Sequence, residues 1–336
     1  ALLREERLPA ALFTERYAAA RDDRARLEVV RRFLEVAPHD GRLRGRLLAL
    51  LDAVGEREAL LEEVRRLAQD PYADAVLLAD AASTLARLGL ADESRRGFGE
   101  IAERGAQDPW AQAFLGDRLR AEGLHDEAAR AYAALLELSP EDAAGTIRSA
   151  LAHAGAGRVD LARRSLTRVA TTFGMRSGRP ELAELASVLA HRIVGEALRA
   201  EGLEAAQRRV LELSVAELGE LGHRASLLVF APPGGPAPEL VLERGTGDAK
   251  RLAPPDVVTG SLGLSLLRIE PVEGEPLRLV ARRAPGLAPE PAYTLELVLI
   301  GPELRVSRRL ELPIDGSRME LTIGRDSLGE PKRIAP

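Results

Sequence analysis

Segments of this chain recur at one fixed spacing, and this period limits the folds that are open to it. Residues 87–106 and 121–140 are offset by 34 positions, and six of these twenty positions are identical. A further step of the same length reaches residues 155–174. The residues that coincide in all three segments are Gly89, Gly123 and Gly157; Asp92, Asp126 and Asp160; and Arg96, Arg130 and Arg164. Such a period is typical of solenoids, in which each unit buries its apolar face only against its neighbours.

Each recurring residue type has a physical role in a helix–turn–helix unit. The glycine is expected to end one helix, where the chain needs a left-handed residue. The aspartate is expected to cap the next helix or to lie in its first turn. The arginine four residues later is expected to pair with that aspartate on the exposed face.

These residues resemble the tetratricopeptide (TPR) family, whose repeat is a helix–turn–helix of about 34 residues. The repeat at 109–142 has Leu115 and Gly116 at the small position of the first helix, Ala128 at the close helix contact, Tyr132 at the aromatic position and Pro140 at the end. The repeat before it has Ala82, Ser94 and Phe98 in those places, and the repeat after it has Ala162 and Leu166.

The sequence departs from the family pattern in two respects. The tryptophan position of the 109–142 repeat holds Gln112, while Trp110 lies two residues earlier. Toward the N-terminus the pattern fades, and Leu48, Leu60 and Val64 fit only as generic apolar positions. We expect a TPR-like array over residues 8–174, closed by helices over 181–201 and 203–221.

The resemblance implies a curved solenoid whose concave surface is lined by the first helix of each repeat. Such a surface typically binds an extended peptide or a helix of a protein partner. The family register gives as candidate partner-binding residues Arg42, Val76, Ser83, Arg87, Trp110, Asp117, Arg120 and Ile147. This set mixes both charges, so the alternative is an ordinary solvated face. Trp110 is either a packing residue or an interface anchor.

The chain changes character near Gly219–His223. Six of the 21 prolines precede residue 223 and fifteen follow it, and the apolar period changes to two, which is typical of strands. The predicted strands are Ala225–Ala231, Glu239–Arg244, Leu262–Glu270, Leu277–Arg283, Tyr293–Ile300, Leu304–Leu312 and Met319–Gly324. Short strands separated by Pro and Gly clusters predict a β-sandwich.

The predicted fold class is therefore α + β multidomain: an α-solenoid of TPR-like hairpins followed by an antiparallel β-sandwich. We assign residues 1–222 to the helical repeat domain, 223–330 to the β-sandwich domain and 331–336 to a tail. Because the segment Gly219–His223 is too short for a free linker, we expect the two domains to touch.

Two segments of the predicted sandwich resemble an uncharacterised β-domain that follows TPR arrays in bacterial proteins with von Willebrand A-type domains. They are LLVFAPPGG at Leu227–Gly235 and VVTGSLG at Val257–Gly263. In that domain the first motif is an acidic strand ending in Asp-Pro-x-Gly, and the second is Thr-x-Gly-Tyr-Gly-Pro. Here the acidic residues and the tyrosine are replaced, so a calcium or ligand role of those acids would be lost.

The sequence carries no recognisable catalytic or metal-binding constellation. It has no cysteine, and none of its five histidines has a partner at metal-ligand spacing; they are His39, His125, His153, His191 and His223. The net charge of −5 gives no basic face for nucleic acid, and no apolar run is long enough for a membrane helix. We expect no enzyme activity, no cofactor, no metal, no nucleic-acid partner and no membrane insertion.

Three functional hypotheses remain open. The first is a non-catalytic scaffold or adaptor for a protein or peptide partner. The second is a structural spacer or capping region of a larger secreted or periplasmic protein, with which the start at Ala1 and the Pro331–Pro336 segment agree. The third is a hydrolase with a site on the sandwich loops, since fold does not decide function. Arginine supplies 45 of the 47 basic residues, which is typical of a GC-rich bacterial genome and leaves the cytoplasmic and the periplasmic or secreted compartments open.

Overall fold

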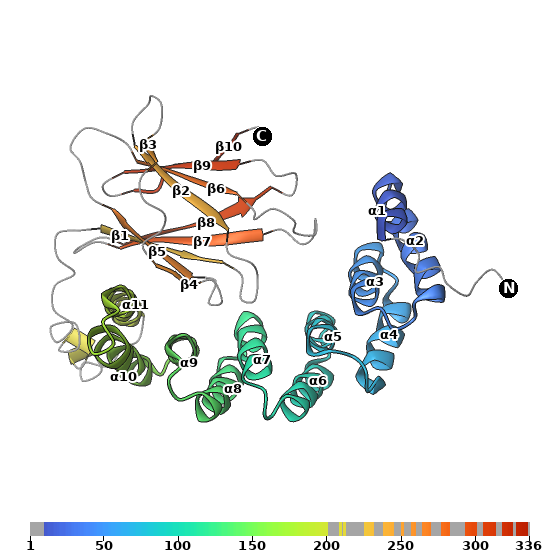
Figure 1. Ribbon diagram of the computed structural model, residues 1–336, viewed down its shortest axis with the longest axis horizontal. Helices are drawn as coiled ribbons and strands as arrows, with labels where there is room; N and C mark the ends of the chain where they lie inside the picture. Colours follow the sequence, from blue (N-terminus) through green and yellow to red (C-terminus); the bar gives the residue numbers. More distant parts are fainter. Residues whose placement is uncertain are drawn as a thin grey trace. The chain divides into compact units, whose positions relative to one another are not determined.

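The computed structural model has a series of α-helices followed by two antiparallel β-sheets (Figure 1). Its internal contacts divide the chain into two compact units, Ala1–Leu115 and Gly116–Pro336. The residues that the structure describes are 10–200, 208–209, 211–212, 225–231, 238–244, 250–251, 257–259, 264–269, 277–282, 293–300, 305–313, 318–324 and 327–334. The predicted boundary at Gly219–His223 lies outside them.

The first unit is built from helical hairpins. Its helices are α1 (Ala10–Ala19), α2 (Asp23–Val36), α3 (Gly41–Val54), α4 (Arg57–Gln69), α5 (Ala75–Arg87), α6 (Ala91–Arg104) and the start of α7 (Pro109–Ala121). Figure 1 shows α3 and α5 on one side of this unit and α4 and α6 on the other. The first helices α3, α5 and α7 begin one repeat period apart, and so do the second helices α2, α4 and α6. The helical repeat therefore continues through the N-terminal region where the sequence pattern fades, within the array predicted over residues 8–174.

The turn inside each hairpin depends on glycine. Gly89, Gly123 and Gly157 have φ of 80°, 76° and 74°, which confirms the predicted left-handed helix ends. Gly55, one repeat earlier, has φ of 81° and adds a fourth member to the series. A residue with a Cβ atom would be strained at each of these turns.

The aspartates that cap helices are not the three that recur beside these glycines. Asp92, Asp126 and Asp160 lie in the first turns of their helices, where carboxylates favour the positive end of the helix dipole. Asp22 caps α2, and Asp40, Asp74 and Asp108 directly precede the first helices and accept hydrogen bonds from amides of the first turn. The last three aspartates recur with the same period as the helices that they cap.

Two of the recurring arginines, Arg96 and Arg130, contact groups other than the predicted aspartate carboxylates. Arg95 approaches the Asp92 carboxylate at 3.5 Å, while Arg96 donates to the Asp92 carbonyl. Arg130 approaches Glu127 at 3.6 Å. The Asp126 carboxylate is 2.9 Å from Arg158, so it ties its hairpin to the next one along the chain.

The second unit begins with further helices of the array. They are α8 (His125–Leu138), α9 (Ala143–Gly155), α10 (Val159–Arg168), the π-helix η1 (Val169–Met175) and α11 (Pro180–Arg199). Helix α11 confirms the helix predicted over 181–201. The helix predicted over 203–221 lies mostly outside the described residues, of which 208–209 and 211–212 are helical.

The strands form two five-stranded sheets with the orders β4-β5-β1-β7-β8, here named sheet A, and β10-β9-β6-β2-β3, here named sheet B. They are β1 (Ala225–Phe230), β2 (Glu239–Arg244), β3 (Lys250–Arg251), β4 (Val257–Thr259), β5 (Leu264–Ile269), β6 (Leu277–Arg282), β7 (Tyr293–Ile300), β8 (Arg305–Leu312), β9 (Arg318–Ile323) and β10 (Lys332–Ile334). All seven predicted strands are present, which confirms the predicted antiparallel sandwich. The additional strands β3, β4 and β10 have two or three residues each, and β10 lies in the segment predicted as a tail.

Strands β1, β5 and β7 of sheet A carry buried residues on both faces. In β1, Leu227 and Val229 belong to the core between the two sheets, whereas Leu228 belongs to a core shared with the helices. The same alternation occurs in β5 and β7, which explains why these strands are apolar at nearly every position. The helical side of the shared core includes Ile147, Leu166, Leu185, Leu189 and Ile193, and the strand side includes Leu228, Leu264, Leu266, Val298 and Ile300. The predicted contact between the helices and the sandwich is therefore confirmed.

One cation fixes α11 to this face of sheet A. The Arg192 guanidinium lies 3.0 Å from the Glu296 carboxylate on β7 and 4.1 Å from the ring centroid of Phe230 on β1. Burial lowers the pKa of Arg192, and Glu296 opposes that change. Such a partly desolvated cation over an aromatic ring adds a directional contact to the apolar core.

The cap series leads to a stability prediction. Replacement Asp74→Ala removes the acceptor of the Leu77 amide, whose bond to the carboxylate is 2.8 Å long, so it should lower the free energy of unfolding by about 1 kcal/mol. The matched control is Asp92→Ala, which removes an exposed pair with Arg95 and a first-turn carboxylate but no capping hydrogen bond, and should cost only about 0.5 kcal/mol. Urea unfolding followed by circular dichroism measures both. Equal losses in the two variants would contradict the assigned capping role.

Candidate partner-binding surface

The first helices of the first unit carry accessible side chains at equivalent positions. Arg42, Val76 and Trp110 are each the second residue of α3, α5 and α7, so they lie one repeat period apart. The preceding cap holds each first turn in place: the Asp40 carboxylate accepts from the Arg42 amide at 2.9 Å, and the Asp108 carboxylate accepts from the Trp110 amide at 2.9 Å. The caps thus present these three side chains in the same way along consecutive repeats.

Trp110 is an exposed aromatic residue and not a core residue. It is 59% exposed, and its ring is stacked on Phe114 one turn later, with centroids 5.3 Å apart and an interplanar angle of 9°. Val76, in the same position of the repeat before, is 40% exposed. Stacking restricts the indole ring, so less side-chain entropy remains to be lost when a partner covers it.

Arg87 lies at the other end of α5 and its side chain is also exposed. Its guanidinium is 3.0 Å from the Asp52 carboxylate of α3 and 3.1 Å from the Thr84 hydroxyl. An exposed pair of this kind contributes little to stability, so a carboxylate of a partner could replace Asp52 at small cost. Together, Arg42, Val76, Arg87 and Trp110 form what is here named the first-helix surface.

Three of the predicted partner-binding residues are buried, and their assignment as surface residues needs correction. Ser83, Asp117 and Ile147 are 4%, 3% and 0% exposed. Ser83 and Asp117 occupy equivalent positions on the packed side of their helices, and Ile147 belongs to the core shared with sheet A. Arg120 is half-buried beside Tyr132. The family register did not separate the packed side of each helix from the open side.

Asp117 is the centre of a buried polar cluster in the second unit. Its carboxylate accepts a hydrogen bond of 2.7 Å from the Tyr132 hydroxyl and bonds of 3.1 and 3.2 Å from Nε of Arg148. Burial raises the pKa of Tyr132 well above its usual range, the Asp117 charge adds to the rise, and Arg120 opposes it. The tyrosine is therefore a neutral donor, and the cluster joins the three helices α7, α8 and α9.

Gly116 makes this cluster possible. A Cβ atom at residue 116 would lie only 2.3 Å from Cε1 of Tyr132, so no larger residue fits under that ring. The small position and the aromatic position that carry the family resemblance are therefore two sides of one contact.

The position that holds tryptophan in the family is used here for hydrogen bonding. Gln112 is buried, and its Nε2 donates to the carbonyls of Gly105 at 3.0 Å and Ala102 at 3.3 Å, at the end of α6. Arg44 occupies the same position two repeats earlier, and its Nε donates to the Pro38 carbonyl at 2.7 Å. In both repeats, a polar side chain ties the first helix to the chain that precedes it.

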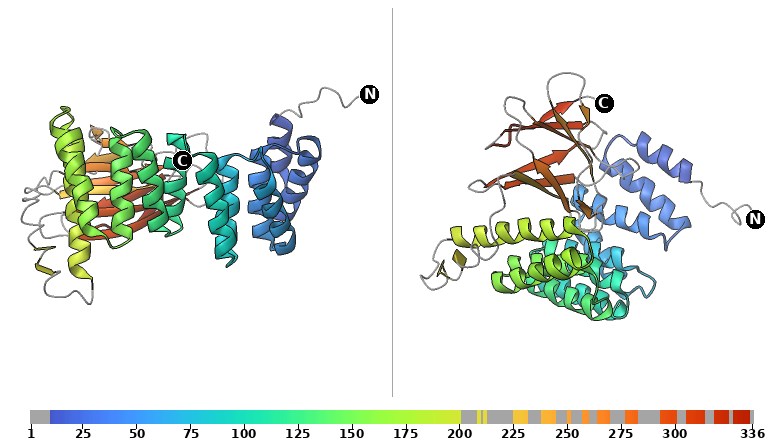
Figure 2. Two further views of the ribbon diagram at one scale, coloured as in Figure 1. Left: turned by 90° about the horizontal axis from the view of Figure 1, so that it is seen from below. Right: turned by 60° about the vertical axis from the view of Figure 1, so that its left-hand side comes forward.

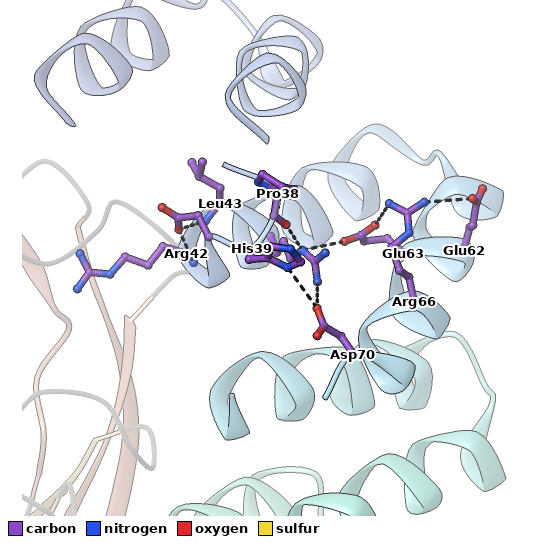
Figure 3. A network of polar contacts seen from close by, with 10 residues as sticks. Pro38, His39, Arg42, Leu43, Glu62, Glu63, Arg66 and Asp70 are labelled. Carbon is purple, nitrogen blue, oxygen red and sulfur yellow. Dashed lines mark hydrogen bonds and ion pairs between the residues drawn. The ribbon is translucent and has the colours of Figure 1, made fainter. Parts of the chain in front are cut away.

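Arg44 also belongs to a buried ionic network between α3 and α4 (Figure 3). Its Nη1 is 2.7 Å from the Asp70 carboxylate and its Nε is 3.9 Å from Glu63, which also binds Arg66 at 3.0 Å. The Tyr72 amide and Arg44 lower the pKa of Asp70, whereas burial raises the pKa of Glu63 against the opposing effect of Arg66 and Arg44. Sequence reasoning missed this network because arginine is the ordinary basic residue of this chain. The sequence feature that could have revealed the network is the position of Arg44, which is the tryptophan position of its repeat.

Among the described residues, the groups at this surface form hydrogen bonds and ion pairs. Among those residues, no group of three or more His, Cys, Asp or Glu side chains is arranged to hold a metal ion. In the same part of the chain, every helix is too short or too polar to cross a bilayer.

Comparisons with known proteins find distant similarity only. No protein-family model matches the sequence, and no curated protein does. Among solved structures, the MamA protein is 16% identical with a TM-score of 0.33, covering 47% of this chain and 88% of that one. YrrB, a TPR protein with an unusual peptide-binding site, is 16% identical with a TM-score of 0.32, covering 48% and 84%.

A TPR protein from Parabacteroides merdae is 14% identical with a TM-score of 0.34, covering 61% of this chain and 86% of that one. The TPR-like description therefore rests on the lengths of the helices of this chain and on the period with which they recur. The resemblance of the sandwich to a bacterial β-domain is not confirmed by these structures.

The Glu63 environment leads to a prediction about pH. Because the folded pKa of Glu63 is raised, the folded state holds its proton to higher pH than the unfolded state does. Its contribution to stability is therefore greatest at low pH and falls as pH rises from the unfolded pKa, about 4.3, through the folded pKa. Replacement Glu63→Gln should remove this fall.

Asp70 provides the internal control for that experiment. Its folded pKa is lowered, so its contribution is present above the unfolded pKa, about 3.9, and is lost as pH falls through the folded pKa. Urea unfolding of the wild type and the Glu63→Gln variant between pH 3 and 7 measures both effects. The assignment to Glu63 is wrong if the two unfolding profiles stay parallel across this range.

The Asp117 cluster leads to a second prediction for this region. Replacement Asp117→Leu removes the carboxylate that pairs with the buried Arg148 charge and should cost about 3–5 kcal/mol of unfolding free energy. The double variant Asp117→Leu, Arg148→Met should be more stable than Asp117→Leu alone, because it also removes the buried charge that has lost this carboxylate. A thermodynamic double-mutant cycle measures this coupling, and additive losses would show that the two residues act separately.

Proposed function

We propose that this chain is a non-catalytic scaffold that holds a segment of a protein partner on the first-helix surface. The single observation that carries the proposal is the exposed, stacked indole of Trp110, aligned with Val76 one repeat earlier. Exposed tryptophan and arginine are the residue types that most often dominate binding energy at protein interfaces. Their repetition along consecutive helices suits a partner segment that runs across several repeats.

The chemistry of the surface suggests what the segment contains. Trp110 and Val76 would cover apolar side chains, while Arg42 and Arg87 would pair with carboxylates. An apolar segment flanked by acidic residues therefore fits this surface best. The rim charges would affect the rate of association and its salt dependence more than they affect final affinity.

A second role, as a structural cap, is favoured by the contact between α11 and sheet A. The sandwich buries apolar residues of α9–α11 that a solenoid end would otherwise expose to water. Terminal repeats need such a cover, and here the chain supplies it from its own C-terminal domain. This role is compatible with partner binding, because it uses residues of the second unit and none of the first-helix surface.

A capture experiment tests the scaffold proposal. The full chain is used as bait beside the variant Trp110→Ala, Arg87→Glu and the control variant Leu161→Ala, Arg95→Glu. The control changes an exposed leucine on α10 and an exposed arginine on α6, which lie outside the first-helix surface. We expect the wild type and the control to retain the same partner. The first variant should lose at least about 90% of it, which corresponds to a roughly tenfold loss of affinity, or about 1.4 kcal/mol of binding free energy.

Quantitative mass spectrometry of the captured proteins gives the result, and circular dichroism verifies that the variants are folded. A partner retained equally by all three baits would place binding elsewhere and contradict the proposal. Failure of the wild type to retain any partner would favour the structural cap as the main role.

A further inference from the structure

The sandwich has one edge that differs from its other three. In the part of the chain that the structure describes, the edge strands β3, β4 and β10 are two or three residues long, whereas β8 has eight residues. All eight residues of β8 pair with β7 in continuous register, from Tyr293↔Leu312 to Ile300↔Arg305. Short edges offer little backbone to another strand, so β8 is the only described edge that presents a long row of backbone donors and acceptors.

Strand β8 lacks the devices that most strongly block such an edge. Its sequence, RVSRRLEL, contains no proline and no glycine, and its unbroken register leaves no bulge that would twist it away. In an antiparallel ladder roughly half of the residues direct their N–H and C=O groups to the open side. An eight-residue edge of about 27 Å is long enough to receive an extended segment of ordinary strand length.

The side chains of β8 define the kind of segment that fits. Leu310 and Leu312 are buried in the core between the sheets and Val306 packs against it, while Ser307, Arg309 and Glu311 are exposed on the other face. The strand carries three arginines against one glutamate, so its formal charge is positive in a chain whose net charge is −5. A strand added here would place apolar residues beside Val306 and Leu310 and acidic residues beside Arg309.

The chain itself already provides one acidic contact at this edge. The Arg308 guanidinium binds the Glu330 carboxylate at 2.7 Å, and the Glu330 side chain is 83% exposed. Glu330 comes from the segment that precedes β10. Arg308 shares the face of β8 that carries Val306 and Leu310, so this ion pair lies on the face where an added strand would place apolar residues.

We infer that the open edge of β8 binds an extended segment of another protein in which acidic and apolar residues alternate, by addition of a strand to sheet A. This site is separate from the first-helix surface and does not depend on it. Backbone hydrogen bonds would supply most of the affinity, and the arginines would select an acidic segment. The competing explanation is that the charges on β8 only protect the edge from pairing with a second copy of this chain.

The test uses the full chain and two synthetic ten-residue peptides, one alternating glutamate with valine and one alternating lysine with valine. Fluorescence anisotropy measures binding, and hydrogen–deuterium exchange measures protection of the Arg305–Leu312 amides. We expect the acidic peptide alone to bind and to protect these amides.

Three variants make the test specific. Arg309→Glu should weaken binding of the acidic peptide by about three- to tenfold, because it places like charges on opposite strands. Glu330→Gln should leave binding unchanged, because Arg308 lies on the face of β8 where the added strand places apolar residues. The control Arg318→Glu, an exposed arginine on β9 of sheet B, should leave affinity unchanged. The variant Trp110→Ala, Arg87→Glu should also bind the peptide normally, which separates this site from the scaffold proposal.

Several results would overturn the inference. They are absence of acidic-peptide binding, equal binding of the lysine peptide, protection outside β8, or an affinity that Arg309→Glu does not change. Concentration-dependent self-association of Arg309→Glu, together with no peptide binding by the wild type, would show that the charges serve only to protect the edge.

Discussion

One helical hairpin cannot bury its own apolar face, and the rest of this structure depends on that constraint. Each hairpin buries its residues against the next, so the spacing of turns and caps must be identical from one repeat to the next. Left-handed glycines at 55, 89, 123 and 157 keep that spacing inside the hairpins. Aspartate caps at 40, 74 and 108 keep it between them. The same caps fix the first turns that present Arg42, Val76 and Trp110.

The last hairpin of an array has no following hairpin, and here a β-sheet takes that place. Sheet A contributes Leu228, Leu264 and Val298 to a core that it shares with α9–α11. Arg192 adds a directional contact through Glu296 and Phe230. Because sheet A also packs on sheet B, its strands β1, β5 and β7 carry buried apolar residues on both faces. Figure 2 gives two further views of this layered arrangement within the second unit.

In this protein, buried polar groups connect helices that apolar packing connects in more regular repeats. Gln112 and Arg44 use the same repeat position to bind carbonyls at the preceding helix end or loop. Asp117 collects donors from Tyr132 and Arg148 on two other helices. Such groups must be fully paired to be tolerated in an interior, so each one restricts how the neighbouring helices can be placed. The cost of losing one partner is correspondingly high.

The sequence by itself determined the helical repeat, the seven long strands and the glycine turns. These features depend on local periodicity and on backbone conformations that only certain residues adopt. Only the tertiary structure decided which side of each first helix is open. Ser83, Asp117 and Ile147 fit the same register as Trp110, but neighbouring helices and sheet A cover them. Burial depends on what packs against a residue, and contacts between distant segments leave no fixed spacing in the sequence.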